Sequence, residues 1–141
     1  MSSTYIPAAL RRLVRERASG CCEYCLMPEQ LSLITYAIDH VIAEKHGGRT
    51  DADNLAFSCL LCNQYKGSDI ASLDPDTNQI SALYNPRTDR WTEHFSLHKA
   101  NFLPLTAKGR VTVNLLKLNW LERIEERLWL AEVELLKLPD Q

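Results

Sequence analysis

The sequence lacks a long hydrophobic run, an excess of basic charge and a secretory pattern at its N-terminus. No apolar segment approaches the roughly 20 residues that a membrane-spanning helix needs, so we expect no membrane anchor. Residues 1–7 contain no charged segment followed by an apolar one, so we expect no secretory signal and a reducing, cytoplasmic location. The net charge is −2, so any site for a polyanion must be a local basic patch.

The composition excludes a largely disordered or low-complexity chain. Hydrophobic residues make up 45% of the sequence and charged residues 24%, which are values typical of a folded globular protein. Because domains commonly contain roughly 100–200 residues, the 141 residues predict one domain over residues 1–141.

Four of the five cysteines form two Cys-x-x-Cys pairs, Cys22 with Cys25 and Cys59 with Cys62. An odd number of cysteines argues against a simple disulfide framework, and two such pairs predict a tetrahedral four-cysteine zinc site. A redox-active pair or unbound thiols in the core are the alternatives, although no thioredoxin-like βαβ pattern surrounds either pair. Cys21 is an alternative to Cys22, but only Cys22 has the Cys-x-x-Cys spacing to Cys25.

Hydrophobic periodicity predicts helices and short strands around these cysteine pairs. The expected elements are a helix over 7–18, strands over 34–42 and 54–58, a helix over 60–66, strands over 80–84 and 93–105, and helices over 106–118 and 120–138. Asn119 is the expected cap of the last helix, and Gly109 is a weak point of the helix before it. The apolar stripe of the last helix is expected to contain Leu121, Ile124, Leu128, Ala131, Leu135 and Leu138.

Polar residues with metal-binding and acid–base chemistry lie between and just after the cysteine pairs. Asp39 and His40 stand at the end of the first expected strand, Asn54 at the next strand, and Asn63 after the second cysteine pair. Carboxylate and carboxamide oxygens are the hard ligands that Mg²⁺ or Mn²⁺ prefers. A neutral histidine is a suitable general base near pH 7, and the combination is the minimum needed to hydrolyse a phosphodiester.

This arrangement resembles the HNH endonuclease family, in particular its zinc-bearing branch. The matching segments are Cys22-x-x-Cys25, Ile38-Asp39-His40-Val41-Ile42, His46-Gly47-Gly48, Asp53-Asn54-Leu55 and Cys59-x-x-Cys62-Asn63-x-x-Lys66-Gly67, with Asn85-Pro86-Arg87, Trp91-x-x-His94-Phe95 and Gly109-Arg110 further along the chain. The series as a whole is specific, whereas any one segment alone is a weak signal.

The resemblance implies a ββα-metal fold and a role for each matching residue. His40 resembles the general base, Asp39 and Asn63 resemble the ligands of a catalytic Mg²⁺ or Mn²⁺, and Asn54 resembles the residue that orients the base and its loop. The four paired cysteines resemble ligands of a structural zinc. The implied reaction is metal-dependent hydrolysis that leaves 5′-phosphate and 3′-hydroxyl ends.

Elementary geometry adds two expectations to the implied site. Neighbouring residues of a regular strand point to opposite faces, so the strand must end, bend or bulge at Asp39 and His40 if both flank one phosphate. Asn63 and Lys66 are three residues apart and share a helix face, which predicts that Lys66 meets a phosphate near the metal.

Two further residues are candidates for nucleic-acid binding. His46 precedes Gly47 and Gly48, where backbone amides can approach an anion, although a plain turn explains the glycines equally well. Arg87 belongs to the locally basic segment 85–110, for which an ordinary solvated surface is the alternative.

The sequence therefore predicts an α+β protein with a small ββα-metal core over about residues 20–68, stapled by zinc and flanked by N-terminal and C-terminal helices. Strands and helices over 69–141 complete the single domain. The expected activity is that of an endonuclease with DNA as its partner, structural Zn²⁺ and catalytic Mg²⁺ or Mn²⁺. The alternatives are a non-catalytic zinc-stabilised module that binds nucleic acid, and a zinc-stapled protein-interaction domain that uses the last helix.

Overall fold

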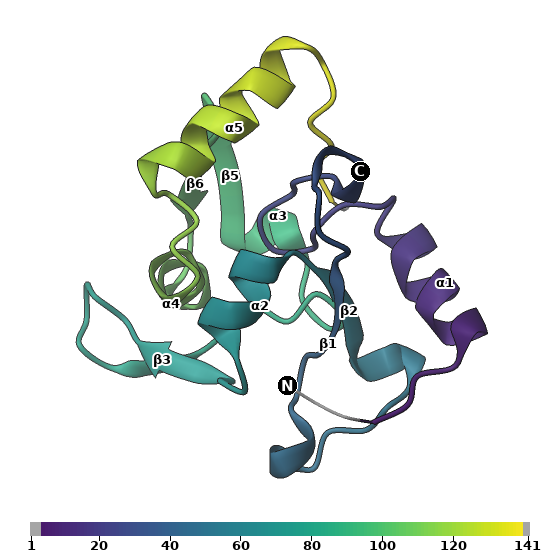
Figure 1. Cartoon of the computed structure of the whole chain (residues 1–141). Coiled ribbons are helices and arrows are strands. Elements are labelled where there is room, and N and C mark those ends of the chain that lie inside the picture. The colour runs from purple at the N-terminus through teal and green to yellow at the C-terminus, as the bar shows by residue number, and fades with distance from the viewer. Residues whose placement is uncertain (1–3, 140–141) are drawn as a thin grey trace. The chain divides into compact units, whose positions relative to one another are not determined.

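The computed structural model describes residues 4–139, and the chain divides into two compact units (Figure 1). The first unit runs to Ile70 and the second begins at Ala71. The described residues form five α-helices and three two-stranded antiparallel sheets, which confirms the predicted α+β class. None of these helices is long and apolar enough to cross a membrane. The assignment of residues 1–141 to one domain stays a prediction.

The first unit contains the predicted ββα arrangement. Its elements are α1 (Ala8–Arg17), short 3-10 turns at Glu29–Leu31, Glu44–His46 and Ala52–Asn54, β1 (Ala37–His40), β2 (Leu55–Ser58) and α2 (Leu60–Lys66). Strands β1 and β2 pair antiparallel, with Ala37 opposite Ser58 and His40 opposite Leu55. Strand β1 is shorter than the predicted strand over 34–42, whereas α2 has the predicted bounds.

Helix α2 begins and ends where its flanking residues dictate. Cys59 is its N-cap, and the Cys59 sulfur accepts a hydrogen bond from the backbone N–H of Cys62 at 3.4 Å. Gly67 follows the last helical residue with a φ of +51°, a backbone conformation that glycine adopts without steric cost. The cysteine pair and the glycine therefore fix α2 directly after β2.

Helix α1 is tied to the start of β2 by hydrogen bonds from an arginine. The guanidinium of Arg17 donates hydrogen bonds to the carbonyl oxygens of Ala52 at 2.7 Å and Leu55 at 2.5 Å. Val14 of α1 and Leu55 and Phe57 of β2 are fully buried. These contacts give the first unit an apolar core. The loop between β1 and β2 begins and ends at strands that pack on this core.

The second unit has its own elements and its own core. They are β3 (Ala71–Leu73), β4 (Ile80–Ala82), α3 (Trp91–His94), β5 (Phe95–His98), β6 (Asn101–Pro104), α4 (Ala107–Leu115) and α5 (Leu121–Glu132). The rings of Trp91, Phe95 and Phe102 lie 5.5–6.0 Å apart, and all three residues are buried in this core.

The strands of the second unit differ from the prediction in two places. Residues 93–105 form the end of α3 and a hairpin of β5 and β6, because Lys99 and Ala100 have positive φ angles and turn the chain. Strand β3 lies in a segment for which no helix or strand was predicted. Gly109 is required for close packing, since a Cβ atom there would lie 2.3 Å from the carbonyl oxygen of His94.

The predicted apolar stripe and cap of the last helix are wrong. Arg123, Arg127 and Leu130 are the buried residues of α5, whereas the predicted stripe residue Leu121 is 66% exposed. The side chain of Asn119 does not cap α5, because its amide pairs with the backbone N–H and carbonyl of Phe102.

Candidate functional site

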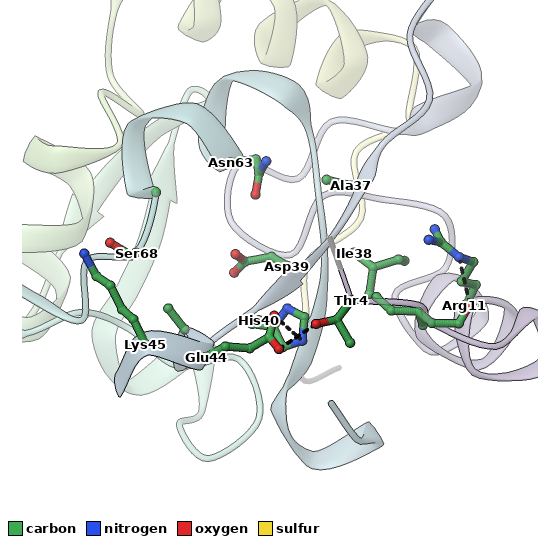
Figure 2. Close-up of a pocket in the computed structure, with 13 residues that line it drawn as sticks. Thr4, Arg11, Ala37, Ile38, Asp39, His40, Glu44, Lys45, Asn63 and Ser68 are labelled. Carbon is green, nitrogen blue, oxygen red and sulfur yellow. Dashed lines mark hydrogen bonds and ion pairs between the residues drawn. The ribbon is translucent and has the colours of Figure 1, made fainter. Parts of the chain in front are cut away.

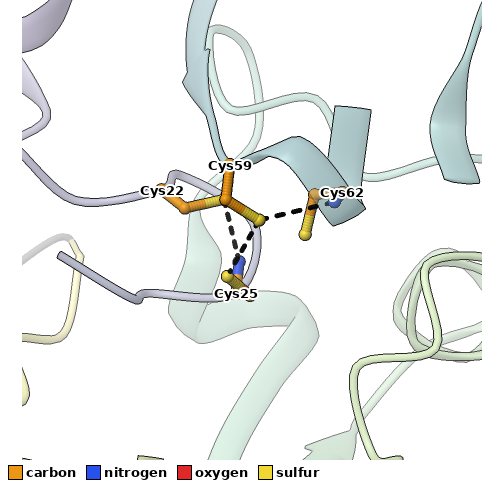
Figure 3. Close-up of side chains that lie close together, drawn as sticks. All are labelled: Cys22, Cys25, Cys59 and Cys62. Carbon is orange, nitrogen blue, oxygen red and sulfur yellow. Dashed lines mark hydrogen bonds between the residues drawn. The ribbon is translucent and has the colours of Figure 1, made fainter. Parts of the chain in front are cut away.

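The four paired cysteines form one buried cluster in the first unit (Figure 3). Their sulfur atoms all lie within 4.8 Å of one another, and the sulfurs of Cys25 and Cys59 are 3.6 Å apart. Zn–S bonds of 2.3 Å in a tetrahedron place sulfurs about 3.8 Å apart, so the cluster has the composition and spacing of a four-cysteine zinc site.

The surroundings of the cluster favour thiolates bound to a cation. Backbone N–H groups of Tyr24 and Cys25 donate to the sulfur of Cys22 at 3.4 Å. Burial raises the pKa of the Cys22 and Cys62 thiols, so thiolates at these positions need a positive ion beside them. None of the five cysteines forms a disulfide. Cys21 lies outside the cluster, with its sulfur 3.5 Å from the carbonyl oxygen of Ser19.

A pocket of about 690 Å³ brings together the predicted acid–base and metal-binding residues (Figure 2). Asp39 and His40 reach it from the end of β1, and Asn63 reaches it from α2. Figure 2 shows the Asn63 amide facing the Asp39 carboxylate, and the His40 ring beside Glu44. Strand β1 ends at His40, as predicted, and both neighbouring side chains line the pocket.

The Asp39 carboxylate is almost fully buried and is held by two donors. It is 5% exposed, its Oδ2 accepts a hydrogen bond from the hydroxyl of Tyr24 at 2.9 Å, and the same oxygen lies 3.1 Å from Nζ of Lys66 in an ion pair. Nζ of Lys66 also lies 3.3 Å from Oδ1. Burial raises the pKa of Asp39, while the ammonium of Lys66 and the hydroxyl of Tyr24 oppose that shift.

Lys66 has a different environment from the one predicted. Its side chain is 2% exposed, and Nζ donates to the carbonyl oxygen of His40 at 3.2 Å as well as to Asp39. The pocket lining does not include it. The helix spacing places Lys66 near Asn63, but a buried ammonium needs a counter-charge, and Asp39 supplies it.

The His40 ring is fixed through one of its two nitrogens. Nε2 lies 2.8 Å from the hydroxyl oxygen of Thr50 and 4.0 Å from a carboxylate oxygen of Glu44. No residue among 4–139 hydrogen-bonds Nδ1, which leaves that nitrogen to react. Thr50 was not predicted from the sequence; its position in the short loop between Gly48 and Asn54 is the only sequence signal that points to it.

Residues 22–69 match the model of the HNH endonuclease family. The matched segment contains both cysteine pairs and all the pocket residues except Thr4, Ile6 and Arg11. The chain carries an HNH endonuclease domain. The four-cysteine cluster is consistent with the zinc-bearing branch of that family. No curated protein and no solved structure matches the chain.

Asn54 of the HNH domain holds the loop that carries Thr50. Its Oδ1 accepts from the backbone N–H of Ile42 at 2.9 Å, and its Nδ2 donates to the carbonyl oxygens of Ile42 and Arg49 at 2.9 and 2.8 Å. These bonds close the loop between β1 and β2. Asn54 therefore acts on His40 through the loop and Thr50, and it makes no hydrogen bond to the imidazole itself.

Gly48 allows this loop to close. A Cβ atom at Gly48 would lie 1.7 Å from the carbonyl oxygen of Ile42 and 2.9 Å from Nδ2 of Asn54. Gly48→Ala is therefore expected to lower the free energy of unfolding by about 1–3 kcal/mol, as overpacked sites do.

Denaturant unfolding of the purified variant measures this loss, with Arg49→Ala as the control. The Arg49 side chain is exposed and forms only a surface ion pair with Asp51 at 3.4 Å, which contributes little to stability. Equal stability of Gly48→Ala and Arg49→Ala would contradict a tightly closed loop.

The remaining predicted residues lie outside the centre of the pocket. His46 is exposed, and its Nε2 lies 3.1 Å from the carbonyl oxygen of Ser68, a residue of the pocket wall. Arg87 is half-buried in the second unit, where its backbone N–H donates to Oδ1 of Asn85. Their roles in nucleic-acid binding stay predictions. The pocket wall also includes two basic side chains that were not predicted as site residues, Arg11 and Lys45.

Proposed function

We propose that this protein is a metal-dependent endonuclease that hydrolyses phosphodiester bonds in DNA. The observation that supports it is the meeting of one imidazole and two oxygen donors in a single pocket of the HNH domain, His40 with Asp39 and Asn63. A protein-interaction domain has no use for this combination, whereas phosphodiester hydrolysis requires it.

The residues present fit a divalent ion. A carboxylate oxygen of Asp39 and the carboxamide oxygen of Asn63 are hard donors that line the same pocket, and waters and a phosphate oxygen would complete the ligand set. When bound, Mg²⁺ or Mn²⁺ polarises the scissile phosphate and stabilises the charge that develops on the leaving oxygen. A neutral carboxamide is a weaker ligand than a carboxylate, so binding of the ion is expected to tighten with substrate.

His40 is the general base of the proposed reaction. With Nε2 held by Thr50, Nδ1 accepts the proton of a water molecule that attacks the phosphorus in line with the leaving oxygen. The bond between phosphorus and the 3′ oxygen breaks, and that oxygen takes a proton from solvent water, which leaves a 5′-phosphate and a 3′-hydroxyl. Asn54 keeps the loop closed, so that Thr50 continues to fix the ring.

The four-cysteine cluster has a structural part in this proposal. Zn²⁺ held by Cys22, Cys25, Cys59 and Cys62 joins the loop before β1 to the junction of β2 and α2. Since α2 carries Asn63, the zinc fixes one ligand of the catalytic ion without entering the chemistry.

Incubation of supercoiled plasmid with the purified protein tests the proposal. Nicked or linear DNA is expected to form with added Mg²⁺ or Mn²⁺ and to be absent without it. End-labelling of the products should give the pattern expected of 5′-phosphate and 3′-hydroxyl ends. Absence of cleavage with either ion, on duplex and single-stranded DNA alike, would contradict the proposed activity.

A non-catalytic module that binds nucleic acid is the second candidate, and the ion pair between Lys66 and Asp39 favours it. A buried ammonium on the carboxylate competes with a divalent ion for the same oxygens. This candidate predicts salt-sensitive retention of DNA in a gel-shift assay, with no cleavage at any Mg²⁺ or Mn²⁺ concentration.

Removal of the Thr50 hydroxyl is expected to slow cleavage by up to about a hundredfold. Thr50→Val keeps the shape of the side chain but releases Nε2 of His40, and loss of ring orientation misplaces the base. Single-turnover cleavage rates measure the effect. Thr88→Val, which changes an exposed threonine of the second unit, is the control. Equal rates for both variants would contradict a positioning role for Thr50.

A further inference from the structure

Tyr24 lies within the first cysteine pair, and its side chain contacts the carboxylate of Asp39. It stands between Cys22 and Cys25, is 2% exposed, and donates its hydroxyl hydrogen to Oδ2 of Asp39 at 2.9 Å. The loop that brings two sulfurs to the zinc cluster therefore also delivers a hydrogen-bond donor to the proposed ligand of the catalytic ion.

The second cysteine pair makes a matching connection. Cys59 and Cys62 begin α2, and Lys66 in the last turn of the same helix donates to Asp39. Both halves of the zinc cluster are thus linked to a single carboxylate, one through a neutral hydroxyl and one through an ammonium. Asp39 is the point at which the two halves converge.

The two oxygens of Asp39 are not equivalent. Oδ2 accepts a hydrogen bond from Tyr24 at 2.9 Å and lies 3.1 Å from Nζ of Lys66 in an ion pair, whereas Oδ1 accepts a hydrogen bond from Nζ of Lys66 at 3.3 Å. A hydroxyl that fixes one carboxylate oxygen sets the direction in which the whole group points. Tyr24 therefore fixes the carboxylate through Oδ2, and Figure 2 shows the carboxylate facing the same space as Asn63.

We propose that Tyr24 is a positioning residue that couples the zinc cluster to the catalytic metal site by fixing the Asp39 carboxylate. The proposal rests on the proposed function, because it gives Asp39 its part as a metal ligand. Tyr24 suits this task better than Lys66, since a neutral hydroxyl orients the carboxylate without competing for it as a second cation.

Tyr24→Phe removes only the hydroxyl, and Tyr36→Phe is its matched control. Tyr36 is 7% exposed, lies in the same unit, and donates its hydroxyl hydrogen to the carbonyl oxygen of Met27 at 3.0 Å, in the segment that follows the first cysteine pair. The two variants therefore lose the same atom from comparable buried sites, and only Tyr24 contacts Asp39.

Binding of Mn²⁺ to the full-length protein, measured by the electron paramagnetic resonance signal of the free ion, is the deciding measurement. Loss of a residue that orients a metal ligand commonly costs 10–100-fold in metal affinity, so we expect Tyr24→Phe to bind Mn²⁺ about tenfold or more weakly and Tyr36→Phe to match the wild type. Cleavage by Tyr24→Phe should fall most at limiting Mn²⁺ and recover as the ion is raised, with zinc content unchanged.

The outcomes separate this proposal from the proposed function. Equal Mn²⁺ affinity in Tyr24→Phe and Tyr36→Phe, in a wild type that binds Mn²⁺ and cleaves DNA, overturns the role of Tyr24 alone. Loss of zinc from Tyr24→Phe also overturns it, because Tyr24 would then support the cluster rather than Asp39. A wild type that neither binds Mn²⁺ nor cleaves DNA overturns the proposed function and this inference together.

Discussion

His40→Ala is expected to reduce DNA cleavage by about 10²- to 10⁴-fold, the range that a general base contributes. The loss follows from the removal of Nδ1, the nitrogen that no described residue hydrogen-bonds and that accepts the proton of water in the proposed reaction. The fold should persist, because the backbone pairing of His40 with Leu55 does not involve the ring. Zinc content should persist as well, since the ring's hydrogen bond to Thr50 and its ion pair with Glu44 do not involve the cysteine cluster.

Single-turnover cleavage of plasmid, with zinc content and thermal melting measured on the same samples, checks this expectation. His98→Ala is the matched control, because His98 is an exposed histidine of β5 in the second unit. Wild-type cleavage by His40→Ala would remove His40 from the reaction. A parallel loss of zinc or of folding would assign the histidine a structural part instead.

The features of the site that the sequence predicted are those fixed by local spacing. Two Cys-x-x-Cys pairs allowed only one compact arrangement of four sulfurs, and the second pair with Gly67 set the bounds of α2. The end of β1 at His40 followed from the need to bring neighbouring side chains to one pocket. Each of these depends on residues close together in the chain, which spacing rules can relate.

The features that the sequence did not predict depend on partners far along the chain. Lys66 and Asp39 form their ion pair only because α2 packs on β1, and Thr50 reaches His40 only because Asn54 and Gly48 close the loop. Periodicity reports which face an element can bury. It does not report which buried polar group will meet which partner.

The last helix, α5, shows that hydrophobic periodicity can also predict the wrong buried face. Its leucines repeat as a core-facing stripe would, yet α5 buries two arginines. Arg123 donates to the carbonyl oxygen of Leu116, and Arg127 donates to those of Leu118 and Ala100. A guanidinium that donates to buried carbonyl groups gains charge-assisted hydrogen bonds, and this gain offsets its burial. Hydrophobic pattern alone could not predict that outcome.

Cys25→Ser is expected to unfold the HNH domain. Apparent binding energies of about 10–16 kcal/mol for structural zinc are as large as the whole stability of an ordinary domain, about 5–15 kcal/mol. The cluster joins the segment before β1 to the junction of β2 and α2, so its loss is expected to release Tyr24 and Asn63 together. A serine oxygen cannot replace the thiolate as a zinc ligand of comparable strength.

Cys21→Ser is the matched control for this change, because Cys21 is equally buried but lies outside the cluster. Zinc content by metal analysis and hydrogen exchange over residues 22–66 measure the two variants. We expect rapid exchange and zinc loss only in Cys25→Ser, and a stable, zinc-replete Cys25→Ser would contradict the four-cysteine site. Loss of zinc from Cys21→Ser would instead make Cys21 a ligand.

Removal of the two metals should therefore have different consequences in one protein. Withdrawal of zinc by a zinc-selective chelator is expected to abolish both cleavage and the folded state of the HNH domain, whereas omission of Mg²⁺ or Mn²⁺ is expected to abolish cleavage and leave the thermal melt unchanged. The difference follows from where each ion would lie. Four buried sulfurs join two separate segments of the chain, while Asp39 is already held by Tyr24 and Lys66. A melt that shifts equally on loss of either metal would contradict this division between structure and chemistry.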